Sequence, residues 1–308
     1  MPTDEPTDPL AKFEAAVRTR VGADADAWLE GLPELISSVR ATWDLMITGP
    51  AREVDAFGMT IPATRANEGV SLRMAYPDAW FVDETTALTA WNGEGAVRLL
   101  ESEPLGAHLR AAPVPGTSLG AERNPMRALR LVAEALRTLW IPAPAGLQTV
   151  SAEVRAWIGE MPARYESAHR PFERQLLVDA QQLFRSFMPT QTSQVLLHGD
   201  ARLDAFVTDG DRAIAIDPKP LVGEPAFDVA SLLRDKPGDL VEDPVAGREQ
   251  LQARLDQLTD QLDVPPSRVK GWAFAVAVDT GLLAYEQSDP DGGDLMLEVA
   301  RLCQSLTV

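Results

Sequence analysis

Two aspartates, Asp200 and Asp217, each follow a short apolar run and could act together on a phosphate group. Asp200 comes soon after the run at 195–197, and Asp217 ends the run at 214–216. The letters Asp-Gly-Asp at 209–211 are typical of a hairpin turn between the two runs. A carboxylate beside a hydroxyl can accept its proton, and Mg²⁺ takes oxygen ligands. Taken alone, the triplet at 198–200 favours an Asp200 that caps a turn, so this chemistry needs support from the rest of the chain.

The composition is that of an ordinary globular protein. The 308 residues are 45% hydrophobic, which is enough for a sizeable core and for two lobes. Residues 1–5 are acidic where a secretion signal is basic, and no apolar run is long enough to cross a bilayer. We therefore expect a soluble, cytoplasmic protein. The single cysteine, Cys303, excludes internal disulfides and cysteine-built metal sites, and three scattered histidines are too few to suggest zinc.

The chain is strongly acidic, with a formal net charge of −18. Nucleic-acid binding needs a cationic face that displaces counterions from phosphates, so this charge argues against a nucleic-acid partner. It favours a cationic small molecule, although an acidic surface can also serve solubility alone.

A helical start is followed by short extended runs. Residues up to about 44 place apolar side chains at helical spacing. Five extended runs come next, with a turn at 67–69 and one helical segment at 84–91. The runs are 45–48, 57–61, 70–74, 96–100 and 106–109. The sequence therefore predicts a small β-rich region with one intervening helix.

The rest of the chain is mainly helical. Residues 111–116 are rich in helix and strand breakers and form the candidate hinge before the helices. Asn124 is placed to cap a helix that begins at Pro125. Further helical patterns cover 171–187, 246–262, 269–285 and about 295–306. The helix at 269–285 is apolar along most of its length, so we expect it to be buried.

A longer motif contains the second aspartate. Residues 216–223 read Ile-Asp-Pro-Lys-Pro-Leu-Val-Gly, and the run continues to Asp228. With the triplet His198-Gly199-Asp200, it resembles the aminoglycoside/hydroxyurea antibiotic resistance kinase family, in particular the streptomycin 6-kinase-like branch. The resemblance implies an α+β, protein-kinase-like bilobal fold. Residues 1–112 would form the N-terminal helices and a small nucleotide-binding β-lobe, and residues 113–308 a larger, mainly helical lobe with the catalytic loop and the acceptor site.

The resemblance also implies roles for these residues. Asp200 would be the catalytic carboxylate that accepts the proton of the acceptor hydroxyl, and Asp217 would hold Mg²⁺. His198 would be structural, and Asp228 would brace the catalytic loop by accepting backbone hydrogens. Lys219 belongs to the family signature and could pair with Asp217, contact a phosphate, or lie at the surface.

Three positions depart from the family pattern. Relatives have an asparagine metal ligand five residues after the catalytic aspartate, where this chain has Ala205, and the adjacent Asp204 could reach the metal only if the loop shifted. The lysine expected on the third strand is Arg73, which is not equivalent at a tight phosphate site. Its usual partner would be Glu84. The phosphate loop at 57–60 contains one glycine, and related antibiotic kinases are also glycine-poor there.

The acceptor site is the least specified part. Relatives bind cationic aminoglycosides with acids from the C-terminal region, so Asp279 and Glu286 are candidate substrate ligands. The alternative is that Asp279 is an acid on the wet side of a partly buried helix and that residues 286–294 form a solvated loop.

Two functions remain open. The first is an ATP- and Mg²⁺-dependent kinase of antibiotic-resistance type that phosphorylates a hydroxyl of a small, cationic molecule, or of some endogenous secondary metabolite. The second is a catalytically impaired pseudokinase that binds a metabolite or a protein. Ala205 and Arg73 favour the second, because each loss at the transition state could cost about 2–4 kcal/mol.

Overall fold

The computed structural model describes residues 8–52, 54–112, 115–191 and 193–308. It divides into two compact units, Met1–Gly116 and Thr117–Val308, whereas the sequence suggested a division after residue 112. The acidic residues 1–5 and two residues of the candidate hinge, 113 and 114, lie outside the described residues. Among the described helices, none combines the length and apolarity that a bilayer crossing needs.

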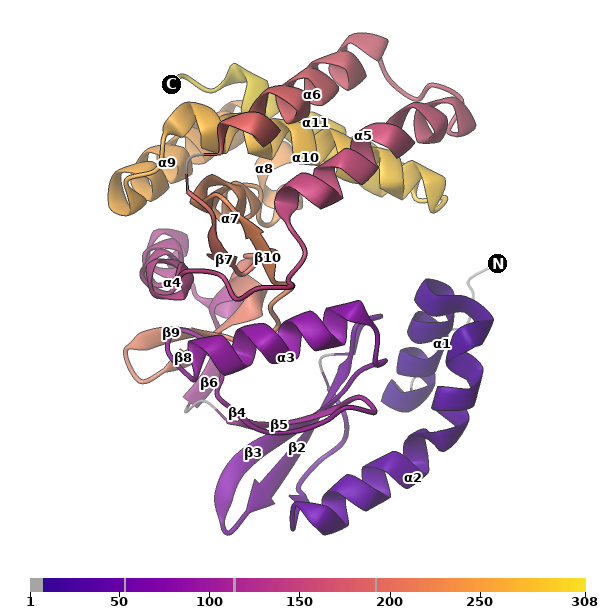
Figure 1. Cartoon of the computed structure of the whole chain (residues 1–308). Helices are drawn as coiled ribbons and strands as arrows, with labels where there is room; N and C mark the ends of the chain where they lie inside the picture. Colours follow the sequence, from indigo (N-terminus) through magenta and orange to yellow (C-terminus); the bar gives the residue numbers. More distant parts are fainter. Residues whose placement is uncertain (1–7, 53, 113–114, 192) are drawn as a thin grey trace. The chain divides into compact units, whose positions relative to one another are not determined.

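The first unit is built on a five-stranded antiparallel sheet (Figure 1). Its strands, in spatial order, are β1 (Met46–Ile47), β2 (Met59–Arg65), β3 (Glu68–Met74), β5 (Ala107–Ala111) and β4 (Leu99–Glu103). Helix α3 (Ala79–Trp91) lies between β3 and β4 in the chain. The predicted five strands with one intervening helix are confirmed. The predicted turn at 67–69 is displaced, because Ala66 and Asn67 take positive φ while Glu68 already pairs with Arg65.

Helices cover both faces of this sheet. On one face, α1 (Pro9–Val21) and α2 (Asp26–Thr42) share an apolar cluster with Leu72 of β3 and Leu109 of β5. Since side chains alternate along a strand, the neighbours Arg73 and Arg110 point to the other face, where α3 lies. The alternation of side chains along β3 and β5 thus places these polar side chains on the face that α3 covers.

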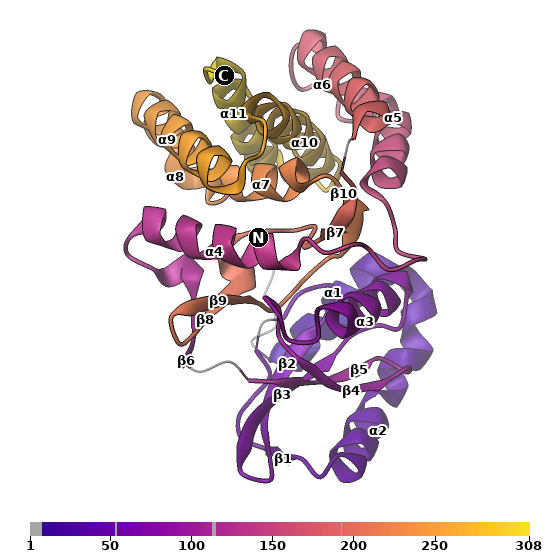
Figure 2. The ribbon, with the colours of Figure 1, turned by 60° about the vertical axis from the view of Figure 1, so that its left-hand side comes forward.

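The second unit is mainly helical (Figure 2). Its central helix, α10 (Pro266–Glu286), packs against α5, α6, α7, α9 and α11, and this explains its apolar surface. The surrounding helices are α4 (Pro125–Leu139), α5 (Val150–Ser167), α6 (Arg174–Phe187), α7 (Pro225–Leu233), α8 (Pro237–Val241), α9 (Pro244–Leu262) and α11 (Pro290–Ser305). The predicted Asn124 cap is confirmed, because its side chain accepts a hydrogen bond from the N–H of Arg127.

Short strands carry the central motif of this unit. β7 (Val195–Leu197) pairs antiparallel with β10 (Leu221–Gly223), and β8 (Phe206–Asp209) forms a hairpin with β9 (Arg212–Ala215). The two-residue loop contains Gly210 at φ 63°, as its Asp-Gly-Asp sequence predicted. β6 (Pro115–Ser118) precedes these strands in the chain, and its Thr117 N–H donates to Oγ1 of Thr208 in β8. This arrangement places both aspartates of interest in loops beside the hairpin.

Candidate active site

The His198-Gly199-Asp200 loop follows directly from the end of β7. Gly199 has φ 82°, and a Cβ at this position would lie 1.8 Å from the carbonyl oxygen of Lys219. Only glycine therefore allows the two segments to approach this closely. Backbone hydrogen bonds from Lys219 N–H to the His198 carbonyl, 2.8 Å, and from Ile216 N–H to the Ala205 carbonyl, 3.0 Å, join the same segments. The loops that bear Asp200 and Asp217 are thereby fixed side by side.

Asp228 of α7 binds the backbone of this loop. Its fully buried carboxylate accepts hydrogen bonds from the backbone N–H groups of His198, 2.9 Å, and Gly199, 2.8 Å, and from the indole of Trp140, 3.0 Å. Burial raises the pKa of Asp228 to about 6, although the three donors act in the opposite direction. The side chain is where the family pattern places a brace for the catalytic loop.

The side chain of His198, at the start of the loop, is also fully buried. Its ring stacks on Phe206, and its Nδ1 accepts the backbone N–H of Asp200 at 3.3 Å. Burial lowers the pKa of His198 to about 4, although Asp200 and Asp217 both raise it. The imidazole is therefore neutral near pH 7 and serves as a hydrogen-bond acceptor within the loop.

Asp200 is held by two cations. One carboxylate oxygen lies 2.8 Å from Nζ of Lys219 and the other lies 3.0 Å from Nε of Arg202. Burial alone would raise the pKa of Asp200, but these two cations lower it to about 2. Asp200 is therefore ionised at all pH values of interest. Lys219 contacts Asp200, a pairing that was not among the three possibilities considered for it from the sequence.

The position of the expected second metal ligand carries no donor. Ala205 is 3% exposed, and its methyl group cannot bind a cation. Asp204 is engaged elsewhere: its Oδ1 accepts a hydrogen bond from the Ser118 hydroxyl at 2.8 Å, and its carboxylate lies against Gly120. The structure therefore does not bring Asp204 to Asp217 as a ready metal ligand. Among the described residues, no group of three or more His, Cys, Asp or Glu side chains forms a metal cluster.

One Mg²⁺ ion nevertheless fits this donor set. Mg²⁺ in kinase sites is commonly held by one or two protein carboxylates, with phosphate oxygens and water completing the shell. Asp217, half-buried just beyond the end of β9, would supply one such carboxylate.

The first unit contains a buried polar cluster between β3, β5 and α3. Oε1 of Glu84 lies 2.7 Å from Nη2 of Arg110 and 3.8 Å from Nε of Arg73. Nη2 of Arg110 also donates to Nδ1 of His108, 3.2 Å away. Burial, with the nearby Arg110 and Arg73, lowers the pKa of His108 to about 2. The cluster thus combines two guanidinium groups with one carboxylate and a neutral imidazole, and it unites the predicted pair Arg73 and Glu84.

A glycine in the predicted phosphate loop makes room for Arg73. A Cβ at Gly58 would lie 2.7 Å from Cζ of Arg73. Asp55 closes the loop, because its Oδ1 accepts the N–H groups of Phe57 and Gly58, each at 2.8 Å. The single glycine at 57–60 is therefore the position that the bulkier arginine requires.

The two candidate acceptor residues both contact one arginine. Arg164 of α5 lies 3.4 Å from Asp279 and 3.1 Å from Glu286. Asp279 is 6% exposed, so the alternative of an acid on the wet side of the helix is wrong. Burial raises the pKa of Asp279 to about 6, although Arg164 lowers it. A substrate cation at these acids would have to replace Arg164.

The raised pKa of Asp279 predicts a specific pH dependence. The folded pKa, about 6, lies above the ordinary value of 3.8 for an aspartate, so the folded state holds the proton more tightly. The contribution of Asp279 to stability is therefore present at low pH and is lost as the pH rises from about 4 to about 6. Relative to wild type, Asp279→Asn should gain about 2 kcal/mol of unfolding free energy between pH 4 and pH 7. Urea titrations at both pH values measure this gain. If the unfolding free energies of wild type and Asp279→Asn change equally between the two pH values, the raised pKa of Asp279 is contradicted.

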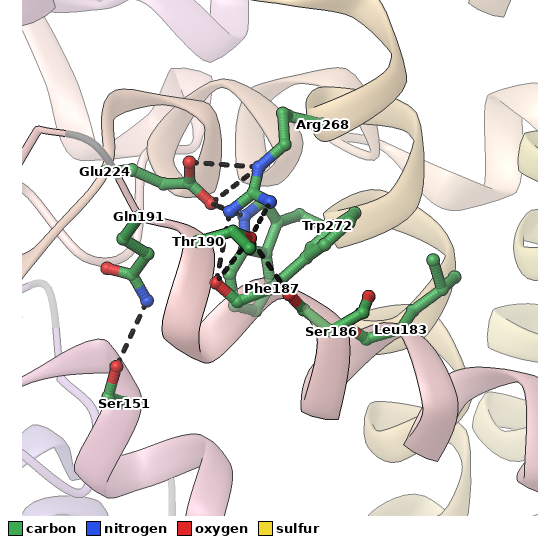
Figure 3. A network of polar contacts seen from close by, with 9 residues as sticks. All are labelled: Ser151, Leu183, Ser186, Phe187, Thr190, Gln191, Glu224, Arg268 and Trp272. Atoms are coloured by element: carbon green, nitrogen blue, oxygen red, sulfur yellow. Dashed lines mark hydrogen bonds and ion pairs between the residues drawn. The ribbon is translucent and has the colours of Figure 1, made fainter.

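A further buried network joins the junction between β10 and α7 to α10 (Figure 3). Glu224 lies between β10 and α7, and its carboxylate accepts two hydrogen bonds from Nε of Arg268 at 3.0 and 3.1 Å and one from the Trp272 indole. Arg268 also stacks over Phe187 at 4.0 Å and donates to the Thr190 hydroxyl at 2.8 Å. The network anchors the junction from which both β10 and α7 support the loop.

Removing the charge at Glu224 should destabilise the second unit. Glu224→Gln leaves Arg268 without its counter-charge in a largely buried position, and we expect a loss of about 3 kcal/mol. Glu298→Gln is the matched control, because Glu298 pairs with Arg301 at the surface and should change stability by less than about 1 kcal/mol. Denaturant unfolding of both variants checks the difference. Equal effects would show that the Glu224 network does not anchor the junction.

The family model of the aminoglycoside/hydroxyurea antibiotic resistance kinases matches residues 55–288 of this chain. The chain belongs to that family. A relative, the streptomycin 6-kinase of Streptomyces griseus, is 29% identical over 262 residues, which cover 82% of this chain and 83% of the relative. The hydroxyurea phosphotransferase of Kitasatospora aureofaciens is 32% identical over 281 residues, covering 87% of this chain and 77% of the relative. The family membership that residues 198–228 indicated is thus confirmed.

Solved structures of such kinases confirm the fold. Aminoglycoside phosphotransferase APH(4)-Ia, in a ternary complex with AMP-PNP and hygromycin B, matches with a TM-score of 0.61 at 15% identity, over 88% of this chain and 98% of that one. Choline kinase LicA from Streptococcus pneumoniae matches with a TM-score of 0.60 at 14% identity, over 89% and 99% of the two chains. The α+β architecture expected from the family resemblance is therefore confirmed.

Sequence reasoning did not assign several residues of this kinase-family site. Arg110, Trp140, Arg202 and Glu224 were not singled out, although the first three contact assigned residues and Glu224 pairs with Arg268. Arg202 is only two positions from Asp200, so its proximity could have been recognised. The other three contacts depend on strand register and helix packing.

Proposed function

We propose that this chain transfers the γ-phosphate of ATP to a hydroxyl of a small, cationic, aminoglycoside-like molecule, with Mg²⁺ as cofactor. The observation that supports this most is the carboxylate of Asp200, presented by a loop that Asp228 braces and that is hydrogen-bonded to the segment carrying Asp217. ATP is abundant in the cytoplasm, where we propose that the enzyme acts. Family membership makes phosphotransfer the first expectation, and the acceptor is the part that experiment must supply.

The low pKa of Asp200 fits a late proton transfer. The acceptor hydroxyl would donate a hydrogen bond to the carboxylate, its oxygen would bond to the γ-phosphorus, and the bond from that phosphorus to the bridging oxygen of ADP would break. In a loose transition state the hydroxyl loses its proton only when the new bond is well formed. A carboxylate with a pKa of about 2 therefore orients the hydroxyl first and takes the proton last.

Each unit by itself contains cations that suit phosphate oxygens. In the first unit, Arg73 takes the place of the usual lysine, with Arg110 beside the same Glu84. In the second, Lys219 lies at Asp200, and Asp217 would hold Mg²⁺, which would neutralise phosphate oxygens. Two guanidinium groups near one carboxylate leave the Arg73 cluster cationic, as a phosphate site requires.

The proposed acceptor rests on the net charge of the protein and on the acceptors for which related proteins are named. The net charge of −18 favours the approach of a cation over that of a polyanion such as a nucleic acid. Relatives are named for streptomycin and for hydroxyurea, and a structural neighbour binds hygromycin B. Resistance to an aminoglycoside antibiotic is the corresponding biological role.

A thermal-shift titration tests the proposal. ATP with Mg²⁺ should raise the melting temperature of the wild-type protein, because a ligand that binds only the folded state stabilises it. Streptomycin should add a further shift in the presence of a non-hydrolysable ATP analogue. Absence of any nucleotide effect up to millimolar concentration would refute the kinase assignment.

A pseudokinase is the second candidate, favoured by the methyl group of Ala205 and by Arg73 at the lysine position. The double replacement Ala205→Asn with Arg73→Lys distinguishes the two functions. Nucleotide binding that appears only in the double variant would support the pseudokinase. Binding already present in the wild-type protein would oppose it.

A further inference from the structure

The cation beside Asp200 that the proposed function leaves unused is Arg202. Its side chain is 50% exposed, yet its Nε lies 3.0 Å from Asp200. Nζ of Lys219 lies 2.8 Å from the other oxygen of the same carboxylate. Each carboxylate oxygen thus has its own cation, and the two cations differ in exposure.

The loop that carries Arg202 lacks a second metal ligand. Ala205 has no donor atom, and the carboxylate of Asp204 is bonded to Ser118. The phosphoryl group carries charge on its three equatorial oxygens at the transition state, and a second metal ion usually neutralises part of it. In this loop, the exposed cation Arg202, two residues after Asp200, is available for that charge instead.

We propose that Arg202 binds the γ-phosphate of the nucleotide and takes over the role of a second metal ion. The inference rests on the proposed kinase function and adds a catalytic residue to it. A γ-phosphate beside Asp200 can draw away the exposed Arg202 more readily than the less exposed Lys219. The freed guanidinium has a planar fork of donors that matches two phosphate oxygens.

Two consequences follow for nucleotide binding. Arg202 should favour nucleotides that contain a γ-phosphate over ADP. The complex should also bind a single divalent cation per nucleotide, because Ala205 offers no second ligand and the carboxylate of Asp204 is bonded to Ser118. Neither consequence depends on knowing the acceptor.

Calorimetric titration of AMP-PNP and of ADP, each with Mg²⁺, tests the first consequence. Arg202→Ala should weaken AMP-PNP binding about 10-fold or more, as expected for one charge-assisted contact to phosphate, while ADP binding changes by less than about 2-fold. Arg202→Lys should retain part of the discrimination. Arg130→Ala is the matched control. Arg130 is 51% exposed and pairs with Glu134 at 2.8 Å, so its replacement removes the same charge from a similar ion pair.

The outcomes separate this inference from the kinase assignment. If the wild-type protein binds neither nucleotide, the kinase assignment fails, and this inference fails with it. If it binds both and Arg202→Ala weakens both equally or neither, only the role of Arg202 is refuted. Electron paramagnetic resonance with Mn²⁺ and AMP-PNP should show one bound ion per nucleotide, and two ions would also overturn the inference.

Discussion

Asp200→Asn should lower the turnover of phosphoryl transfer by about 1,000-fold or more. A positioned general base contributes about 10²- to 10⁴-fold, and the replacement also removes the negative charge that holds Lys219 and Arg202. The amide has the shape of the carboxylate, so the protein should still fold and still bind ATP. Initial rates of ADP release with a saturating acceptor measure the loss.

Asp204→Asn is the control for this prediction. Asp204 is exposed, lies four residues along the same loop and is bonded to Ser118 rather than to a candidate reacting group. Its replacement should leave turnover within about 3-fold of wild type. Equal losses in the two variants would indicate that charge on the loop matters in general and that Asp200 has no specific role.

The ionisation of Asp200 also predicts its effect on stability. Its folded pKa, about 2, lies below the ordinary value of 3.8 for an aspartate. The stability from its ion pairs is therefore present above about pH 4 and is lost as the pH falls towards 2. The stability cost of Asp200→Asn should accordingly be largest near neutral pH and should shrink below pH 4.

Asp228→Ala should cost about 3–5 kcal/mol of unfolding free energy. The carboxylate is fully buried, and its removal leaves the N–H groups of His198 and Gly199 and the Trp140 indole without their shared acceptor. Each buried donor that loses its partner costs about 1–3 kcal/mol. Urea unfolding at neutral pH measures the change, and the catalytic loop should become more accessible to protease.

The control for Asp228 is an aspartate of the same unit at the surface. Asp256→Ala on α9 removes an exposed carboxylate that accepts one hydrogen bond from Gln252, and it should change stability by less than about 1 kcal/mol. A cost for Asp228→Ala no larger than that of the control would contradict the brace.

Much of the catalytic segment could be predicted because its signals are local. The hairpin turn at 209–211, the strands on either side and the position of Asp228 all lie within one short stretch of sequence. The five strands of the first unit were also predictable, since each is a separate apolar run ended by turn residues. Local signals therefore located the loop, the hairpin and the brace together.

The remaining contacts depend on how distant segments pack. Trp140 reaches Asp228 from a different helix, and Arg110 shares Glu84 with Arg73 only because β5 pairs with β3 in one particular register. No feature of the single sequence specifies that register. Helix α5 was missed for another reason: its apolar residues have helical spacing, but Pro162 in its interior argues against a helix.

Transfer of label from ATP to an acceptor tests the central claim most directly. The wild-type protein and Asp200→Asn are incubated in parallel with Mg²⁺, ATP labelled in its γ-phosphate, and streptomycin or another cationic aminoglycoside. We predict that label appears on the antibiotic with the wild-type protein and not with Asp200→Asn. If wild-type protein that binds ATP transfers label to none of these acceptors, or if Asp200→Asn transfers it equally well, the account of this site is contradicted.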